Sequence, residues 1–298
     1  MKANVGASKR EGFVKVFRNH SGRVHEARVV TSVLFTSALF LILACAPPPA
    51  RNQNAASPAP SPQQASTPAA TPQQASTPTA TATQSVSDVG DIRFTAINHA
   101  SFQIEYGGKV IHVDPWSKGD YSAAKQADLI LVTDIHEDHL DTAAIKRVRK
   151  AGAPVVAPSA AAGKIEKPTV INNGETKTVA GVSIEAVPMY NIQRRNSKGE
   201  FFHTKGRGNG YVLTLGDKRV YIAGDTECTD EMRALKNIDA AFVPMNLPYT
   251  MPPSEAAECV KAFKPKVVFP YHYKDQNPEE FKSALAGESV EVRLLKWY

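Results

Sequence analysis

The sequence predicts a layered α/β domain, in which β-sheets are flanked by helices, over about the last 210 of the 298 residues. Two observations carry this prediction. Strand-like segments joined by short glycine turns dominate the first part of the region, and helix-like and strand-like segments alternate in its last third. Antiparallel strands mixed with strand–helix units are typical of sheets covered by helices. With 42% apolar and 21% charged residues, the chain has the composition of a globular protein.

Short runs rich in β-branched and aromatic residues predict strands, and turn residues separate these runs. The predicted strands lie at 92–97, 101–106, 109–113, 128–132, 154–157, 169–172, 182–188, 210–215 and 219–223. Gly107-Gly108 and Gly216-Asp217 are expected to form tight turns. Ala, Ile and Val recur at helical spacing over 141–150. The last third alternates, with helices expected at 230–236, 254–263 and 278–285 and strands at 240–243, 267–269 and 290–294.

The first 45 residues have the three parts of an export signal: a basic leader, an apolar run at 29–44 and a small residue at its end. This run is short for a membrane-spanning helix, which needs about 20 residues. It ends in Ile42-Leu43-Ala44-Cys45, which resembles a bacterial lipobox, so lipidation is expected at Cys45. We therefore expect an exported lipoprotein of the cell membrane or outer membrane that faces the periplasm or the exterior. An uncleaved anchor helix is the alternative, and it would leave the domain on the same side.

Residues 46–88 consist almost entirely of Pro, Ala, Ser, Thr and Gln, and Pro-Gln-Gln-Ala-Ser-Thr-Pro occurs at 62–68 and again at 72–78. Because this composition buries too little apolar surface to fold, we expect an extended tether before a domain at 89–298. The net charge of +6 comes mostly from the first 45 residues. They hold seven Lys and Arg against two Glu, which leaves 28 basic and 27 acidic residues elsewhere. Nucleic-acid binding is not expected, because it needs a basic surface.

The strongest chemical signal is Thr133-Asp134-Ile135-His136-Glu137-Asp138-His139-Leu140-Asp141, directly after a predicted buried strand. Four potential metal ligands, Asp134, His136, Asp138 and His139, lie within six residues. Imidazole and carboxylate groups suit zinc and similar divalent ions. The alternative is a solvated acidic turn before a helix, in which Asp138 or Asp141 caps the helix N-terminus.

Two later residues make the metal interpretation more specific. Asp225 in Ala223-Gly224-Asp225-Thr226 and His272 in Tyr271-His272-Tyr273 each follow a predicted strand. Proteins of the α/β class tend to place their sites at the carboxyl ends of strands. We therefore expect these residues and the 134–139 cluster to form one metal centre.

These motifs resemble those of the metallo-β-lactamase superfamily: His-x-His-x-Asp-His, then a lone His, then Gly-Asp, then a late His. His99-Ala100-Ser101-Phe102 and the turn at 111–115 look closest to its L-ascorbate-6-phosphate-lactonase-like branch, and the resemblance spans about residue 91 to residue 298. It implies a four-layer αββα sandwich in which Asp225 bridges two metal ions. The metal ligands that it implies are His136, Asp138, His139, Asp225 and His272.

Two positions depart from the family pattern, and both belong to the first of the two metal sites. Asp134 stands where the first His is usual, and the position of the lone His falls at Asn191. A carboxylate can still bind a divalent ion, and His203 is expected either to replace the missing imidazole or to donate a proton. Whether Asn191 or His203 completes this site stays open. We expect one tightly bound Zn²⁺ and a weaker second ion, with Mn²⁺ or Fe²⁺ as alternatives.

The resemblance implies hydrolysis of a small-molecule lactone, ester or phosphodiester by metal-bound hydroxide. Asp138 is expected to bind metal and orient the nucleophile, with His203 or a Tyr as proton donor. Asp114 and His99 resemble positions that support the ligands. A metallonuclease and a non-catalytic envelope ligand-binding module that keeps a structural metal are the alternatives. Cys228 and Cys259 could pair in an oxidising compartment, but the sequence does not place them close together.

Overall fold

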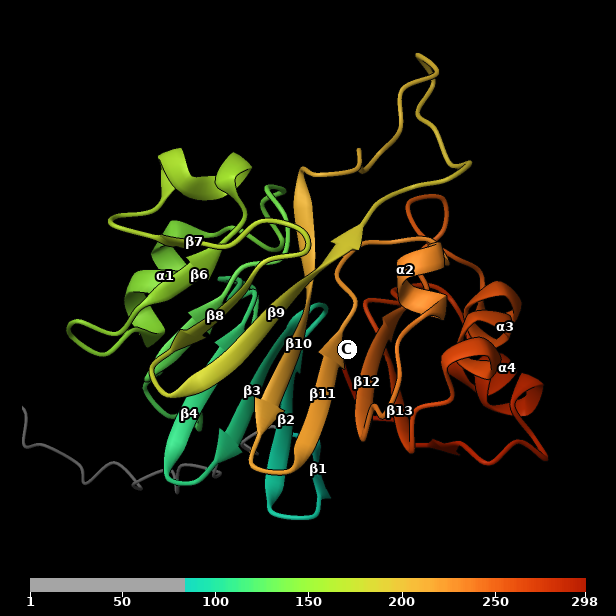
Figure 1. Ribbon diagram of the computed structural model, residues 1–298, viewed down its shortest axis with the longest axis horizontal. Coiled ribbons are helices and arrows are strands. Elements are labelled where there is room, and N and C mark those ends of the chain that lie inside the picture. The colour runs from blue at the N-terminus through green and yellow to red at the C-terminus, as the bar shows by residue number, and fades with distance from the viewer. Residues whose placement is uncertain (1–83) are drawn as a thin grey trace, which may run out of the picture. The chain divides into compact units, whose positions relative to one another are not determined.

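The computed structural model of the protein describes residues 84–298, which form two facing β-sheets with helices on both outer sides (Figure 1). Each sheet has seven strands. The predicted signal segment, Cys45 and most of the predicted tether lie outside the described residues. Among the helices of residues 84–298, none is long and apolar enough to cross a bilayer.

The strands of the first sheet follow one another in chain order. They are β1 (Val86–Val89), β2 (Ile92–Asn98), β3 (Ser101–Tyr106), β4 (Lys109–Val113), β5 (Leu129–Leu131), β6 (Val155–Ala157) and β7 (Thr169–Val170). Strands β1 to β4 pair antiparallel, whereas β4 to β7 pair parallel. Parallel neighbours need crossover connections, and two of these contain α1 (Thr142–Val148) and the 3₁₀ helix η1 (Ser159–Lys164).

The second sheet repeats this plan, with an antiparallel half and a parallel half. Its strands are β8 (Thr176–Val179), β9 (Val182–Met189), β10 (Gly208–Leu215), β11 (Lys218–Ile222), β12 (Ala240–Pro244), β13 (Val267–Tyr271) and β14 (Glu291–Val292). The crossovers of the parallel half contain α2 (Asp230–Arg233), α3 (Pro253–Phe263) and α4 (Pro278–Ala284).

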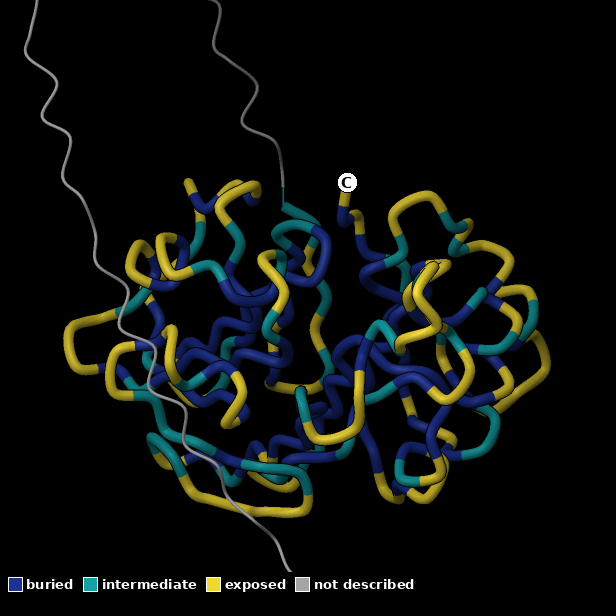
Figure 2. The backbone as a smooth tube through the Cα atoms, turned by 90° about the horizontal axis from the view of Figure 1, so that it is seen from above, coloured by how far each residue is buried: buried dark blue, intermediate teal, exposed yellow. Residues whose placement is uncertain are grey.

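Three apolar clusters separate the four layers. Between the sheets, Phe242 stacks on both Phe102 and Phe269, with ring centroids 4.2 and 4.9 Å apart. A second cluster joins the second sheet to α2, α3 and α4, and a third joins the first sheet to α1 and η1. Buried backbone therefore runs through the middle of the domain and exposed residues lie mainly in the outer loops (Figure 2). The predicted αββα sandwich is confirmed.

Most predicted elements are present, and their ends differ from prediction by a few residues. Helix α1 begins after Asp141, whose carboxylate accepts hydrogen bonds from the amides of Ala143 (2.9 Å) and Ala144 (3.0 Å). Asp141 is thus the N-cap that the acidic-turn alternative allowed. Strand β1 begins at Val86, inside the segment that its composition assigns to the tether. The edge strand β8 is mostly exposed and has no apolar face from which it could be predicted.

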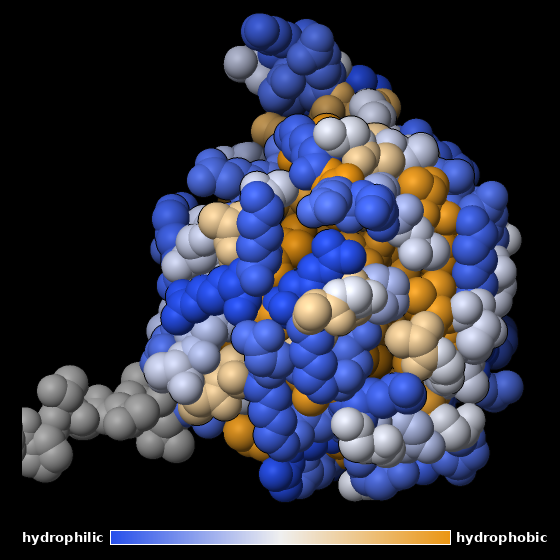
Figure 3. All heavy atoms as spheres, turned by 90° about the vertical axis from the view of Figure 1, so that its left-hand side faces the viewer, coloured by the Kyte–Doolittle hydropathy of each residue, from blue (hydrophilic) through white to orange (hydrophobic). Residues whose placement is uncertain are grey.

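The side of the domain that carries α1 and η1 is largely hydrophilic, with apolar residues visible between the polar ones (Figure 3). The connection between β9 and β10 projects beyond both sheets (Figure 1). This projecting loop is mostly exposed from Gln193 to Glu200 and then returns to buried positions at His203. After its exposed part, the loop therefore returns to the ends of the strands at His203.

Candidate metal centre

The carboxyl ends of four strands position the side chains of the centre. Asp114 follows β4, the 133–141 motif follows β5, Asp225 follows β11 and His272 follows β13. Close backbone contacts hold these ends together. The amide of Asn209 donates to the Thr133 carbonyl at 2.8 Å, and Gly224 has a φ of +66° and no room for a Cβ atom beside Met189. Only glycine accommodates both constraints at this position.

Asp138, His139, Asp225 and His272 form what we call the second half-site. The Nε2 atom of His139 lies 3.4 Å from Asp225 Oδ2 and 3.9 Å from Asp138 Oδ2. The Nε2 atom of His272 lies 3.4 Å from Asp138 Oδ2 and 3.5 Å from Asp225 Oδ1. The structure therefore brings together four predicted ligands from three separate segments of the chain.

The donor atoms of the second half-site fit a divalent metal ion. His139 Nε2, His272 Nε2 and Asp225 Oδ1 are buried and have no hydrogen-bond partner among the described residues. Buried polar atoms are normally paired, because an unpaired one costs free energy. Two ligand atoms about 2.1 Å from a tetrahedral ion lie about 3.4 Å apart, close to the separations in this half-site. One ion would satisfy all three unpaired atoms.

The remaining ring nitrogens of both histidines are held by neighbouring side chains. His139 Nδ1 lies 2.8 Å from Asp114 Oδ2, and Asp114 also accepts hydrogen bonds from the amide and hydroxyl of Thr133. The side-chain amide group of Asn246 lies beside His272 Nδ1, with its nitrogen at 3.2 Å. A His272 that binds metal through Nε2 carries its proton on Nδ1, and Asn246 would then turn its amide oxygen toward that proton. Such partners fix the orientation of a metal-binding imidazole. Asp114 and His272 have left-handed backbone φ values of 43° and 49°, a strained conformation that is common in functional sites.

Asp138 is held by a chain of hydrogen bonds through His99. The amide of Lys274 donates to the Tyr298 hydroxyl at 2.8 Å, and this hydroxyl lies 2.6 Å from His99 Nδ1. His99 Nε2 lies 3.1 Å from Asp138 Oδ2. Because an ionised carboxylate only accepts, a neutral His99 carries its proton on Nε2 and accepts from Tyr298 on Nδ1. The ring thereby orients Asp138.

The cluster of carboxylates attracts positive charge. Burial disfavours the charged form of His139, but the carboxylates of Asp225, Asp114 and Asp138 outweigh it and raise the pKa of this ring well above its usual value. Burial also opposes ionisation of Asp225, yet His272, His139 and His203 hold its pKa well below the usual range. The centre thus stabilises a cation among its carboxylates, either a proton or a metal ion.

Asp134, His136 and His203 form what we call the first half-site, beside the shared Asp225. His203 Nε2 lies 3.3 Å from Asp225 Oδ2 and 4.0 Å from Asp134 Oδ2, and His136 Nδ1 lies 2.7 Å from Asp134 Oδ2. These three residues could surround an ion. His203, predicted as a ligand or proton donor, is therefore at the centre.

Asn191 does not offer its side chain to the centre but supports His203. Its Oδ1 atom accepts from the His203 amide (2.6 Å) and lies 3.0 Å from His203 Nδ1. Its amide group donates to Glu227 and to the Tyr249 carbonyl. Of these two residues, His203 is therefore the one whose side-chain donor atom faces Asp225 and Asp134. With Nδ1 donating to Asn191, a neutral His203 presents a lone pair on Nε2.

Sequence reasoning did not identify Arg207 as part of the centre. Its Nε and Nη2 atoms donate to the two carboxylate oxygens of Asp134 at 3.1 and 3.0 Å. The glycine-rich context of Arg207 indicates a close backbone approach, but not that the side chain meets a residue 73 positions earlier. Asp134 is fully buried, and its pKa is lowered because His136, His139, His203 and Arg207 outweigh the opposing effect of burial.

A disulfide joins the loop after Asp225 to helix α3. The Cα atoms of Cys228 and Cys259 are 5.6 Å apart, and their sulfur atoms are bonded. Next to it, the buried carboxylate of Glu227 accepts hydrogen bonds from the amides of Ile192, Gln193 and Arg194. These contacts tie the segment that carries Asp225 to the start of the projecting loop.

The centre lies in a pocket of about 610 Å³. Its lining includes His136, Asp138, His203, Asp225 and His272. Around these polar residues stand the aromatic rings of Trp116, Phe202, Tyr249 and Tyr298 and the ammonium groups of Lys118 and Lys274. A pocket with a few convergent polar groups and apolar walls is typical of a small-molecule site.

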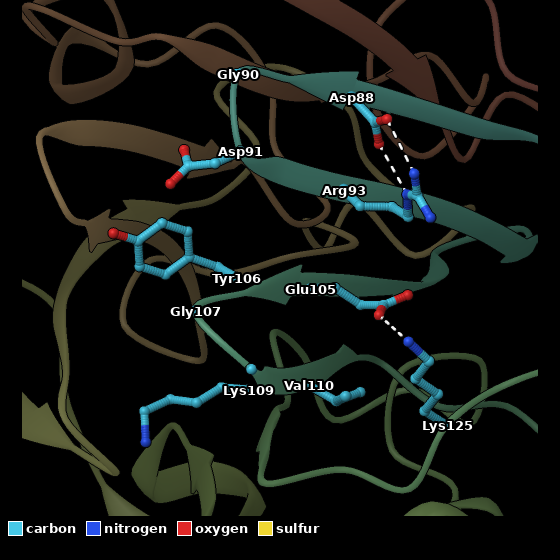
Figure 4. Close-up of a pocket in the computed structure, with 11 residues that line it drawn as sticks. Asp88, Gly90, Asp91, Arg93, Glu105, Tyr106, Gly107, Lys109, Val110 and Lys125 are labelled. Carbon is cyan, nitrogen blue, oxygen red and sulfur yellow. Dashed lines mark hydrogen bonds and ion pairs between the residues drawn. The ribbon is translucent and has the colours of Figure 1, made fainter.

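A second hollow, of about 410 Å³, lies at the opposite end of β4 and lacks such features. Figure 4 shows two ion pairs in it, Arg93 with Asp88 and Lys125 with Glu105, beside Asp91 and Lys109, for which no interaction is drawn. It is open, lies beside the hairpin turns at Gly90 and Gly107, and contains no histidine or cysteine. We therefore assign the active site to the metal centre.

Comparison with known proteins agrees with the geometry. Residues 93–272 match the model of the beta-lactamase superfamily domain. The chain belongs to the metallo-β-lactamase superfamily. The chain resembles the UPF0173 metal-dependent hydrolases of Thermococcus kodakarensis (36% identity) and Methanopyrus kandleri (33% identity). Each alignment covers 69% of this chain, and they cover 96% and 97% of the two relatives.

Solved structures show the same superfamily fold. A crystal structure assigned as a metal-dependent hydrolase from Parabacteroides distasonis is 42% identical, covers 70% of this chain and 94% of that chain, and has a TM-score of 0.66. A metallo hydrolase from Ignicoccus hospitalis has a TM-score of 0.58 at 24% identity, covering 69% and 95% of the two chains. This chain is thus a metal-dependent hydrolase of the metallo-β-lactamase superfamily. The ascorbate-phosphate-lactonase-like branch stays a prediction.

Proposed function

We propose that the protein is an exported, zinc-dependent hydrolase that opens a lactone, ester or phosphodiester bond in a small, negatively charged substrate. The observation that carries the proposal is the second half-site. There, three buried donor atoms have no partner among the described residues. Two of them are ring nitrogens that lie 3.4 to 3.5 Å from the carboxylate oxygens of Asp138 and Asp225, which suits a tetrahedral ion. Two imidazoles and two carboxylates form a donor set that zinc accepts.

A bound zinc ion supplies a nucleophile by lowering the pKa of water, and it polarises the bond under attack. The residues of this chain hold and orient the groups around that chemistry. His99 fixes the carboxylate of Asp138 at 3.1 Å. Asn191 fixes the ring of His203, so that its Nε2 atom faces Asp225. A neutral His203 can accept a proton there, and only its protonated form could donate one to a leaving group.

The pocket lining supports a substrate that has both charge and a flat apolar part. Lys118 and Lys274 line the pocket, and Lys118 Nζ lies 4.5 Å from the centroid of the Trp116 ring. With a dication bound, the two lysines and the ion carry four positive charges and the lining carboxylates, Glu137, Asp138 and Asp225, carry three negative ones, so the pocket would keep a net charge of about +1. Phosphate or carboxylate groups would be attracted to such a site.

The test combines metal analysis with a substrate panel. The purified protein should contain about one zinc per chain and hydrolyse at least one of a set of chromogenic lactones, esters and phosphodiesters. Asp225→Asn serves as the inactive control, and Asp128→Ala, which removes a carboxylate bonded to Lys150, serves as the matched surface control. A zinc-loaded protein with no turnover above Asp225→Asn over the whole panel would contradict hydrolysis.

The altered first half-site favours one alternative, a non-catalytic module that keeps a structural metal. In that case the protein would bind a ligand without converting it. Removal of zinc would lower the melting temperature, and no product would form with or without zinc. The second alternative, a metallonuclease, predicts strongly salt-dependent binding to single-stranded nucleic acid. The near-balance of 28 basic and 27 acidic residues beyond residue 45 argues against it.

Two features support the proposed export: Cys45 at the end of the apolar run, and the disulfide between the other two cysteines. A disulfide between Cys228 and Cys259 suits an oxidising compartment outside the cytoplasm. Cys45→Ser should prevent incorporation of radiolabelled fatty acid and release the protein from membranes, whereas Ser37→Ala in the same apolar run should do neither. Equal labelling of Cys45→Ser and the natural chain would refute lipidation at this residue.

A further inference from the structure

The first half-site already contains a positive charge from the chain. Both carboxylate oxygens of Asp134 accept from Arg207, in a bidentate pair at 3.1 and 3.0 Å. The Asp134 side chain is fully buried and that of Arg207 is 18% exposed. Guanidinium and carboxylate match in geometry, and a pair of this kind is among the stronger polar contacts in proteins. Asp134 is therefore neutralised before any metal ion arrives.

The donors of the first half-site are also spaced differently from those of the second. Asp134 Oδ2 and His136 Nδ1 lie 2.7 Å apart, which is a hydrogen-bond distance and shorter than the 3.4 to 3.9 Å of the second half-site. Arg207 Nη2 lies 3.5 Å from the same His136 nitrogen. Asp134 is thus paired on both oxygens, whereas His139 Nε2, His272 Nε2 and Asp225 Oδ1 of the second half-site are buried and have no hydrogen-bond partner among residues 84–298.

The backbone holds Arg207 in this place. Its amide donates to the Thr204 carbonyl at 3.1 Å, and the amide of Asn209, two residues on, donates to Thr133 O at 2.8 Å. Gly208 lies between them, and a Cβ there would come within 2.7 Å of Thr133 O. The chain thus passes directly beside the residue that precedes Asp134, so the guanidinium reaches Asp134 without a long flexible excursion.

We propose that Arg207 is a built-in cation that replaces the metal ion of the first half-site, so that the protein binds a single zinc ion tightly, at the second half-site. The guanidinium blocks a second ion in two ways. It occupies both oxygens of Asp134, and it places a positive charge where a dication would have to bind. The proposed hydrolysis needs a metal ion only at the second half-site and says nothing about Arg207, so this inference goes beyond it.

The test counts zinc ions by calorimetric titration of the full-length chain in detergent, after removal of metal with a chelator. The natural protein should bind one zinc tightly. Arg207→Met should gain a second, at least about tenfold tighter than any second binding in the natural protein. Lys205→Met is the matched control, because Lys205 lies in the same loop and pairs with Glu231 instead. It should remain at one tight ion.

Two further variants keep the result decisive. Arg207→Gln retains a donor for Asp134 without the charge, and it should also gain the second ion if Arg207→Met does not fold. Combining Arg207→Met with His203→Ala should remove the second ion again, which shows that it lies in the first half-site. Two equally tight ions in the natural protein, or one ion in both folded Arg207 variants, would overturn the proposal. The titration counts bound zinc ions and does not measure hydrolysis. Failure of the substrate panel would therefore contradict the proposed function without changing the result for Arg207.

Discussion

The two half-sites use the same kinds of side chain, yet their donor atoms are in different states. In the second half-site the outer ring nitrogens of His139 and His272 lie beside Asp114 and Asn246, and the inner ones have no hydrogen-bond partner in the part of the chain that the structure describes. In the first half-site Asp134 is paired with both His136 and Arg207. This difference in pairing is the reason for our proposal that zinc binds tightly at the second half-site and not at the first.

The largest effect is expected for Asp225, the carboxylate that the half-sites share. Its Oδ1 lies 3.5 Å from His272 Nε2, and its Oδ2 lies 3.4 and 3.3 Å from His139 and His203. Asp225→Asn should weaken the tight zinc more than about 100-fold and abolish hydrolysis, because it removes a charged ligand. Titration with zinc and circular dichroism of the same sample would check this. Unchanged zinc affinity would mean that Asp225 is not a ligand.

Asp114 should matter nearly as much, although it does not face the pocket. Asp114→Ala removes the partner of His139 Nδ1 and should weaken zinc binding about 10- to 100-fold. It also leaves the Thr133 amide unpaired, so the melting temperature of the metal-free protein should fall as well. Asp114→Asn can still accept one hydrogen bond, and we expect an intermediate zinc affinity. Equal affinity in all three proteins would contradict the supporting role.

Zinc binding to the second half-site should weaken as the pH falls. The carboxylates of Asp225, Asp114 and Asp138 raise the pKa of His139 against the opposing effect of burial, so a proton competes with zinc for this ring more strongly than for a free histidine. Below that pKa the affinity should fall about tenfold per pH unit for each proton released. Calorimetry in buffers of different ionisation enthalpy counts the protons. A count of zero at neutral pH would show that His139 is already neutral there.

The sequence predicted the second half-site well because local patterns report its ligands. Asp138 and His139 are neighbours in one motif, and Asp225 and His272 each follow a strand of buried residues. Parallel pairing of β11, β12 and β13 places Asp225 and His272 at one edge of the second sheet. Their meeting with the motif after β5 depends on how the first sheet faces the second, which no local pattern reports. A layered α/β domain follows from the strand and helix patterns, apart from edge strands such as β8 that have no apolar face. The four-layer αββα arrangement was implied by the family resemblance.

The first half-site could not be predicted in the same way. Its state depends on a side-chain pairing between Arg207 and Asp134, 73 residues apart, and on a loop with no regular secondary structure between β9 and β10. The substitution at Asn191 seemed to remove a ligand. In the structure Asn191 holds His203 in place through its side-chain oxygen. The imidazole at the centre therefore comes from a residue 12 positions later in the same loop. Loop geometry of this kind leaves no periodic signal in the sequence.

His203→Ala should have the smallest effect on the tight zinc, and it sharpens the comparison most. The His203 ring belongs to the first half-site, and its nearest contact with the second is the 3.3 Å approach to Asp225. We expect the tight affinity to change by less than about threefold, whereas any weak second binding should disappear. Asn191→Ala should weaken the second binding only in part, because this variant keeps the His203 ring but removes the side chain that orients it. Zinc titration of both variants beside the natural protein gives the three affinities. A loss of tight binding in His203→Ala comparable to that of Asp225→Asn would mean that the two half-sites act as one.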